Sequence, residues 1–405
     1  MLLVQEFLET HTFSELKEKH GVEVSFNKKG TLFSLNYNQI ESKNDDPLAQ
    51  DCRGLILSLN DKSSLLDQAK LINNRYSYDH ICPGHTNIVA WPFKRFFNYG
   101  QQEAANVDMN DASIIQKVDG TLIICYYFEG KFNIATRSVP EADIVLDPNN
   151  SLTFRTLFEK VLKETYNVDF DTFSKELNPN YTYMFELCSY MNRIVVLYET
   201  DQIFFLGVRN KFTGKEEVPH QKLFGISQPK EFSLSSINDI VSFVNETDAF
   251  QQEGVVVRDS DFNRIKIKNP QHNLMNKARD LLGSSQRACL SLILLEKDDD
   301  AMPLLNDQIK KNILSLKESF VKLNHYVNDQ FDKCYADTQK DIELNKQENA
   351  RKLFALNVQR YNCFSAYMFD RFVGKTDDFK SWVLSKQKNN EWPNGFLDSI
   401  LENLK

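Results

Sequence analysis

Residues 113–127, SIIQKVDGTLIICYY, place two short runs of β-branched and aromatic residues on either side of a Val-Asp-Gly segment. Such runs are typical of β-strands, and Asp-Gly is typical of a turn. The stretch therefore predicts two strands, with Lys117 near the end of the first. Lysine, aspartate and glycine together are common in hairpins, so Lys117-Val118-Asp119-Gly120 alone is weak evidence for chemistry. A lysine becomes a nucleophile when burial or neighbouring cations lower its pKa, so its role depends on which charges converge on it.

Short apolar runs of the same kind recur through the first 270 residues. Residues 22–37 alternate apolar and polar positions around a Lys-Gly turn, which predicts a hairpin. Further strands are predicted at GLILSL (54–59), FNIATRSV (132–139), YTYMFELC (181–188), RIVVLYE (193–199), IFFLGVR (203–209), GVVVR (254–258) and RIKIK (264–268). Helical periodicity appears at 2–19, ended by Gly21, and at about 153–166 and 235–245. Residues 1–270 are thus predicted to form a mixed domain dominated by antiparallel sheet.

The pattern changes after Asn269-Pro270. Apolar residues then recur at steps of three and four, as in an amphipathic helix: Ile309, Ile313, Leu316, Phe320, Leu323, Val327 and Phe331. Residues 348–371, 377–387 and 395–404 are predicted as further helices. We expect an α+β protein in which residues 271–405 form an all-α domain.

Composition indicates a globular protein. Of the 405 residues, 41% are hydrophobic and 26% are charged, and no apolar run reaches the length of a membrane span. The amino-terminal residues lack a signal-peptide pattern, so we expect a cytoplasmic protein. The seven cysteines are scattered without a C-x-x-C pair, which argues for reduced thiols and against zinc or disulfides.

Charge is distributed unevenly. The net charge of −8 would argue against a nucleic-acid partner. Residues 1–270 carry 28 Lys+Arg and 37 Asp+Glu, a net of −9, whereas residues 271–405 carry 20 and 19, a net of +1. Residues 351–405 alone carry 9 and 6. The basic end is compatible with a solvated helical face over a core and with a phosphate-contacting surface.

Several charged residues are candidates to meet Lys117. In a strand, Lys266 and Lys268 share one face, where they need an anion such as a nucleotide phosphate, unless the strand is an exposed edge. A hairpin would bring Glu253 close to both lysines, either functionally or as a plain cross-strand ion pair. Glu186 lies among apolar residues and is expected to be buried with a partner.

Two arginines complete the set of candidates. Arg53, in Asp51-Cys52-Arg53-Gly54, and Arg137 are fixed cations suited to phosphate.

These segments together resemble the ordered motifs of covalent nucleotidyltransferases, the ligases and mRNA capping enzymes. KVDG resembles motif I, FELCSY motif III, EGVVVRD motif IV and IKIK motif V. The flanking segments DCRGLIL, WPFKRFFNYG, FELCSYMNRIVVLYE and FFLGVRN resemble the bacteriophage RNA ligase 1 family, of the tRNA-repair type. The resemblance covers roughly residues 30–270, and the helical remainder is consistent with that family's carboxyl-terminal domain.

The resemblance implies an ATP-dependent RNA ligase with a nucleotidyltransferase domain, acting through lysyl-AMP and RNA-adenylate intermediates. Lys117 would be the nucleophile. Lys266 and Lys268 would bind the α-phosphate and lower the pKa of Lys117 as like charges. Glu186 would accept from a ribose hydroxyl, and Glu253 would bind or orient Mg²⁺, with Mn²⁺ as an alternative.

The remaining roles are also implied by the resemblance. Arg53 would hold the nucleotide or an RNA phosphate, and Arg137 the RNA phosphate. Arg95 stands where the family has lysine, with Lys94 one place earlier, so its phosphate contact is in question. Leu206 and Val256 would enclose adenine or are plain core. Asp299, between Asp298 and Asp300, would contact a second metal or belongs to a helix-capping turn.

The implied partners are RNA with 3′-hydroxyl and 5′-phosphate ends, in particular nicked tRNA, and an end-healing kinase or phosphatase. We expect a monomer without membrane association, in a host cytoplasm if the origin is a phage. Two alternatives remain: a DNA ligase or capping guanylyltransferase, although those usually continue into a β-rich domain, and a non-catalytic RNA-binding protein with a relic nucleotide pocket.

Overall fold

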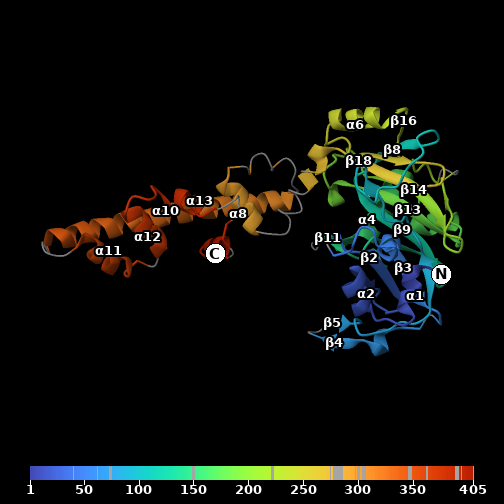
Figure 1. The fold of residues 1–405 in the computed structure, drawn as a ribbon, viewed down its shortest axis with the longest axis horizontal. Helices are drawn as coiled ribbons and strands as arrows, with labels where there is room; N and C mark the ends of the chain where they lie inside the picture. Colours follow the sequence, from blue (N-terminus) through green and yellow to red (C-terminus); the bar gives the residue numbers. More distant parts are fainter. Residues whose placement is uncertain are drawn as a thin grey trace. The chain divides into compact units, whose positions relative to one another are not determined.

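The chain divides into two units, Met1–Leu274 and Met275–Lys405, in a computed structural model (Figure 1). The sequence pattern placed this boundary after residue 270. The structure describes residues 1–39, 41–61, 63–72, 75–147, 151–219, 223–273, 275–276, 286–296, 298, 302, 307–344, 349–361, 364–387, 392–393 and 395–404.

A four-stranded antiparallel sheet lies at the amino-terminal side of the first unit. Its order is β1 (Val22–Phe26), β2 (Leu32–Tyr37), β3 (Arg53–Leu59) and β6 (Thr86–Ala90). The first two strands form the predicted hairpin. Three helices accompany this sheet: α1 (Leu3–Leu8), α2 (Phe13–His20) and α3 (Pro47–Asp51). Residues from these helices and from the sheet form one apolar core.

The predicted single helix over residues 2–19 is wrong, because the chain breaks into α1 and α2. The break occurs at Thr12, whose side chain accepts a hydrogen bond from the backbone N–H of Glu15 and thereby starts a second helix. Gly21 ends α2 in a left-handed conformation, with φ of 62°, where the sequence placed the helix end.

The central sheet has five antiparallel strands. Its order is β10 (Lys131–Thr136), β9 (Thr121–Phe128), β13 (Tyr181–Cys188), β14 (Gln202–Asn210) and β15 (Glu216–Glu217). Helices α4 (Phe154–Tyr166) and α5 (Phe170–Lys175) pack on one face. The other face packs against β3 and β6, so that Ile56 and Val89 share a core with Ile124 and Met184.

A second five-stranded sheet carries the segments of motifs I, IV and V. Its order is β16 (Glu231–Phe232), β8 (Ser113–Lys117), β17 (Gly254–Arg258), β18 (Arg264–Lys268) and β7 (Phe97–Asn98); β7 and β18 are parallel and the other pairs antiparallel. Helix α6 (Ile237–Glu246) covers one face, where Ile114, Val255, Val257, Ile265 and Ile267 are buried (Figure 1). The side chains of the intervening residues lie on the opposite face. Two small hairpins complete the described strands: β4 (Lys70–Ile72) with β5 (Arg75–Ser77), and β11 (Val145–Asp147) with β12 (Leu152–Thr153).

The regular secondary structure described in the second unit is all helical. It contains α8 (Gln286–Leu294), α10 (Asp307–Leu344), α11 (Ala350–Val358), α12 (Ser365–Phe372), α13 (Phe379–Ser385) and α14 (Phe396–Glu402). The region 348–371, predicted as one helix, contains two, α11 and α12. Even the 38-residue α10 has no apolar stretch that would span a bilayer, and no other described helix has one.

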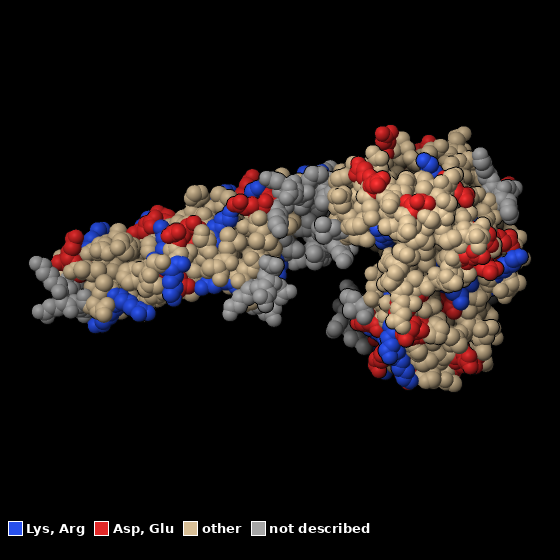
Figure 2. All heavy atoms as spheres, turned by 45° about the horizontal axis from the view of Figure 1, so that its top comes forward, with Lys and Arg blue, Asp and Glu red and all other residues tan. Residues whose placement is uncertain are grey.

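The aromatic residues interleaved with the tail's cations belong to the core of this unit. Phe354 and Tyr367 are fully buried there, and Tyr361, Phe364 and Phe372 pack against them. Several of the cations are paired: Arg371 with Asp332, Lys380 with Glu296, and Lys375 and Lys386 with Asp370. Figure 2 shows cations and carboxylates interspersed over the helical unit. This arrangement favours the solvated helical face over a continuous basic surface.

Candidate active site

Lys117 lies where the chain passes from one sheet to another. It ends β8, and after Val118-Asp119-Gly120 the chain enters β9, which belongs to the central sheet. The two strands on either side of KVDG therefore do not form the hairpin that such a motif commonly marks. Gly120 permits the crossing, since a Cβ atom there would lie 2.4 Å from the carbonyl oxygen of Leu187 on β13.

A buried carboxylate joins two lysines at the end of β8. The Nζ atom of Lys117 lies 2.5 Å from Glu253 Oε2, and Nζ of Lys268 lies 2.7 Å from Glu253 Oε1. Gly254 pairs with both Lys117 and Lys268 across β17, which sets this register. The Glu253 side chain is 5% exposed and the two lysine side chains 21% and 22%. The hairpin thus brings Glu253 to one of the two strand lysines and to Lys117.

The pKa of Lys117 is raised, contrary to the sequence-based expectation. Burial alone would lower it, but the charges of Glu253 and Glu186 outweigh burial. Lys266 is the lysine with a depressed pKa, about 7, because it is buried and faces Lys268, Lys117 and Arg53. The pKa of Glu253 is lowered despite burial, by Lys117 and Lys268.

Glu186 lies on β13 opposite Leu122 and Phe204, close to this cluster. It is half-buried rather than buried, and its carboxylate makes no hydrogen bond or ion pair with the residues that the structure describes. The expected partner is therefore absent among those residues. Burial raises the pKa of Glu186 to about 7, with Lys117 and Arg53 opposing the rise and Glu253 adding to it.

Two cations beside this cluster make no ion pair with the residues that the structure describes. Lys266 makes no ion pair or hydrogen bond through its side chain within the described part of the chain, and Nη1 of Arg53 is buried without a hydrogen-bond partner there. Both side chains lie over the ring of Phe96, with Lys266 Nζ 5.4 Å and Arg53 Cζ 5.7 Å from its centroid. Burial lowers the pKa of Arg53. Half-buried cations without an ion pair among the described residues fit a phosphate group.

Arg95 and Arg137 meet at the ring of Tyr37. Their Cζ atoms lie 4.3 and 5.6 Å from its centroid. Arg95 donates to Asn44 Oδ1 at 2.5 Å, while its Nη1 atom is buried and unpaired among the described residues. The adjacent Lys94 pairs with Asp51 at 3.2 Å. The arginine, rather than the lysine, thus offers a free buried donor.

Three predicted site residues remain, and their positions differ: Val256, Leu206 and Asp299. Val256 pairs with Lys266 across β17 and β18, on the face opposite the α6 core. Leu206 packs against the core between the first and central sheets. Asp299 lies outside the described residues, and the neighbouring Asp298 is buried and pairs with Lys317 at 2.6 Å.

The sequence pattern indicated no role for Asp119 or for any histidine. Asp119 is buried, and its Oδ2 atom accepts hydrogen bonds from the backbone N–H groups of Val195 and Val196 at 2.9 and 2.8 Å. These bonds explain why residues 193–199, predicted as a strand, form a loop: two of their backbone donors are taken by a side chain. His272 Nε2 lies 3.2 Å from the same oxygen. In the sequence, the only indication that His272 belongs to the site was its position four residues after Lys268.

Ligand atoms of Asp119, Glu253 and His272 lie within 4.8 Å of one another, the one group of this kind among the described residues. Carboxylate oxygens suit Mg²⁺. Glu253, the carboxylate of this group that contacts Lys117, is therefore the candidate ligand for a divalent cation.

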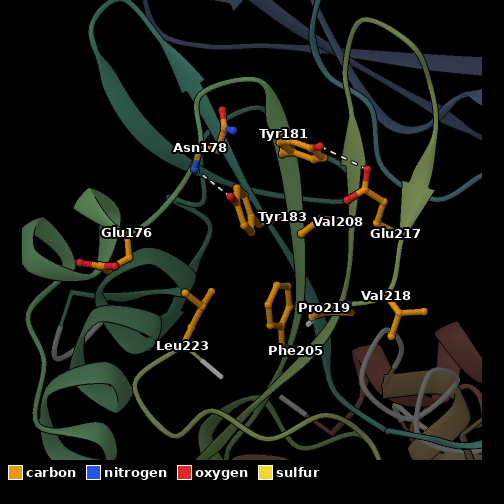
Figure 3. A pocket seen from close by; sticks show the side chains of 10 residues that line it. All are labelled: Glu176, Asn178, Tyr181, Tyr183, Phe205, Val208, Glu217, Val218, Pro219 and Leu223. Carbon is orange, nitrogen blue, oxygen red and sulfur yellow. Dashed lines mark hydrogen bonds between the residues drawn. The ribbon is translucent and has the colours of Figure 1, made fainter. Parts of the chain in front are cut away.

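A separate pocket of about 250 Å³ lies on the face of the central sheet opposite to the face that carries Glu186 (Figure 3). Tyr181 and Tyr183 line it, and side chains at these positions of β13 point away from the face that carries Glu186. Glu217 accepts a hydrogen bond from Tyr181 Oη at 3.2 Å. This pocket is not part of the Lys117 cluster.

A lysine bonded to a buried carboxylate, beside cations without counter-charges, defines a site suited to a nucleotide or another polyphosphate. A family model described as RNA ligase, of the T4 RNA ligase 1 type, matches residues 51–272, more than half of the chain. The chain belongs to this RNA ligase family, as the motif resemblance predicted.

Two relatives and one solved structure illustrate the similarity. A putative bifunctional polynucleotide kinase/RNA ligase of Autographa californica nuclear polyhedrosis virus is 26% identical over 317 residues, which cover 74% of this chain and 41% of the viral protein. An RNA ligase of Rhodothermus phage RM378 is 24% identical over 351 residues, covering 71% of this chain and 78% of the phage protein. An archaeal ATP-dependent RNA ligase superposes with a TM-score of 0.39 at 14% identity, covering 67% of this chain and 63% of that one.

Proposed function

We propose that the protein is an ATP-dependent RNA ligase that joins RNA 3′-hydroxyl and 5′-phosphate ends. The observation that carries this proposal is the cluster of Lys117, Glu253 and Lys268 beside the unpaired cations of Arg53 and Lys266. In the first step, Lys117 Nζ attacks the α-phosphorus of ATP; a P–N bond forms, the bond to the β-phosphate oxygen breaks, and pyrophosphate leaves. The AMP then passes to the RNA 5′-phosphate, and attack by the 3′-hydroxyl seals the strand and releases AMP.

The residues act mainly by positioning and by neutralising phosphate charge. Lys266 and Arg53 would contact phosphate oxygens, and Glu186 would accept from a ribose hydroxyl. The pKa of Lys117 is raised while its amine faces Glu253, so the amine must lose a proton to water before it attacks. A divalent cation held by Glu253 would supply positive charge to the phosphates.

The test is self-labelling with α-labelled ATP or GTP and a divalent cation, resolved on a denaturing gel. We expect label from ATP alone, and its loss in Lys117→Ala but not in the control Lys131→Ala, whose lysine is exposed on β10. Lys117→Ala should still seal pre-adenylated RNA, because that step does not use the amine. Self-labelling that survives in Lys117→Ala would refute the role, and label from GTP alone would indicate capping chemistry.

The natural substrate is proposed on less direct grounds. The family resemblance supports nicked tRNA, with the helical unit selecting the RNA. The viral relative's name, a bifunctional polynucleotide kinase/RNA ligase, supports an end-healing kinase as partner. The monomeric state and the cytoplasmic location remain predictions.

A further inference from the structure

The backbone at His272 is anchored through Asn269 to the backbone of Glu253. It lies in a helical turn directly after β18, and Asn269 Oδ1 accepts from the backbone N–H groups of Gln271 and His272 at 2.8 and 3.2 Å. The backbone N–H of Asn269 donates to the carbonyl of Glu253 at 2.8 Å. Its side-chain amide donates to the carbonyls of Val244 and Thr247, at the end of α6. The position of the imidazole is thus tied to that of Glu253.

The imidazole is buried against Asp119. His272 is 1% exposed, and Nε2 lies 3.2 Å from Asp119 Oδ2, although the angle is not that of a regular hydrogen bond. Nδ1 has no hydrogen-bond partner within the described residues. A buried polar group without a partner is unfavourable, so contact with Asp119 is what compensates for burying this ring. Contacts of this kind in substrate-free sites often tighten when substrate binds.

Asp119 in turn contacts the loop at residues 193–199 as well as His272, and it lies close to Lys117 in the chain. Its carboxylate holds the backbone of Val195 and Val196, and its own N–H donates to Tyr198 Oη at 3.1 Å. It follows Lys117 by two residues, and its charge contributes to the raised pKa of that lysine. Asp119 makes no hydrogen bond to Lys117 in the described structure, where Glu253 is the partner of the amine.

We propose that His272 is a positioning residue for lysine adenylylation: its imidazole fixes the Asp119 carboxylate on the loop that contains Val195 and Val196, and thereby keeps Asp119 off Lys117. This inference rests on the proposed function. Without the ring nitrogen, the Asp119 carboxylate keeps only the two hydrogen bonds from the backbone of Val195 and Val196, and a carboxylate that is held less firmly draws the Lys117 ammonium group out of line with the phosphate. Loss of the ring nitrogen therefore lowers the rate of attack by Lys117, and it leaves ATP affinity and the sealing of pre-adenylated RNA unchanged.

Two replacements separate the ring nitrogen from the ring volume. His272→Phe keeps the volume and removes both nitrogens, whereas His272→Gln places a side-chain amide near the position of Nε2. Since misplacement by about 1 Å can cost about 100-fold in rate, we expect His272→Phe to slow self-adenylylation by roughly 10- to 100-fold, with the KM for ATP within about twofold of wild type. His272→Gln should recover most of the rate, and both variants should seal pre-adenylated RNA normally. His325→Phe, which replaces an exposed histidine of α10, is the matched control.

Equal rates for His272→Phe and wild type would overturn the inference, as would a His272→Gln variant no faster than His272→Phe. If His272→Phe does not fold, a double-mutant cycle of His272→Gln with Asp119→Asn decides. If His272 acts through Asp119, adding His272→Gln to Asp119→Asn should slow self-adenylylation little further. Fully additive losses in rate would overturn the proposal. Failure of wild type to label would overturn the proposed function as well. Normal labelling by wild type and His272→Phe alike would overturn the positioning role alone.

Discussion

Glu186→Gln should stabilise the first unit at alkaline pH while impairing catalysis. The Glu186 carboxyl has a pKa of about 7 in the folded chain, against an ordinary value of 4.5, because burial penalises its charged form. Folding therefore favours the protonated form. The stabilisation from that proton is complete below about pH 4.5 and is lost as pH rises through about 7.

The magnitude follows from the two pKa values. At about 1.36 kcal/mol per pH unit, the difference between 4.5 and about 7 corresponds to about 3 kcal/mol. Glu186 is half-buried, so water reduces this to roughly 1–3 kcal/mol. Glutamine carries no charge at any of these pH values, so the free energy of unfolding of Glu186→Gln relative to wild type should rise by that amount between pH 4.5 and 8.5.

The assay is urea unfolding at 25 °C, at several pH values. Trp91 is the one tryptophan of the first unit, and its fluorescence reports on that unit in a background with Trp382→Phe and Trp392→Phe. Glu199→Gln, which changes an exposed carboxylate, is the control and should give only a small stability difference. A stability difference for Glu186→Gln that is constant from pH 4.5 to 8.5 would refute the reasoning about burial.

Two further predictions concern Glu253 and the helical unit. Glu253→Gln leaves Lys117 and Lys268 without a counter-charge and should cost roughly 1–3 kcal/mol at pH 7, less than a fully buried pair because both ammonium groups are partly exposed. Since the folded pKa of Glu253 lies below 4.5, the difference in free energy of unfolding between variant and wild type should shrink as the pH falls below that folded pKa. Urea unfolding that shows the same difference at pH 3 as at pH 7 would contradict this. Deletion of residues 275–405 should leave self-adenylylation within a few-fold but abolish preference for a nicked anticodon loop over a plain oligonucleotide. Circular dichroism would verify that the shortened chain folds, and an unchanged preference in a ligation assay would count against the helical unit as the selecting element.

Local alternation predicted much of the first unit, because it depends only on the two faces of a strand. Ile265 and Ile267 enter the α6 core, as expected from the spacing that placed Lys266 and Lys268 on the other face. The alternating residues on either side of the Lys-Gly turn likewise predicted the hairpin at residues 22–37. What alternation could not reveal is which sheet a strand joins: β8 and β9 are separated by a three-residue segment and still pair with different partners.

The errors in the site share a physical cause, which is contact between residues distant in sequence. The loop at 193–199 has the composition of a strand, but Asp119, more than 70 positions earlier, takes two of its backbone donors. The pKa of Lys117 was expected to fall because only its neighbouring lysines were considered. In the structure the carboxylate of Glu253 is nearer, at 2.5 Å, and its effect prevails.

The net charge of −8 describes the chain poorly as a binding surface, because solvent-exposed charges are screened beyond about 8 Å at physiological salt. The local balance matters instead. In the helical unit, cations such as Lys380 and Arg371 have carboxylate partners within 4 Å, whereas among the described residues Arg53 and Arg95 of the first unit each have a buried guanidinium nitrogen without a hydrogen-bond partner. If phosphate binding is concentrated there, as proposed, few contacts are made to the rest of the RNA. Each additional phosphate contact strengthens binding to any RNA regardless of sequence, so an acidic surface around a small cationic site favours release of a product that has the same chemistry as its substrate.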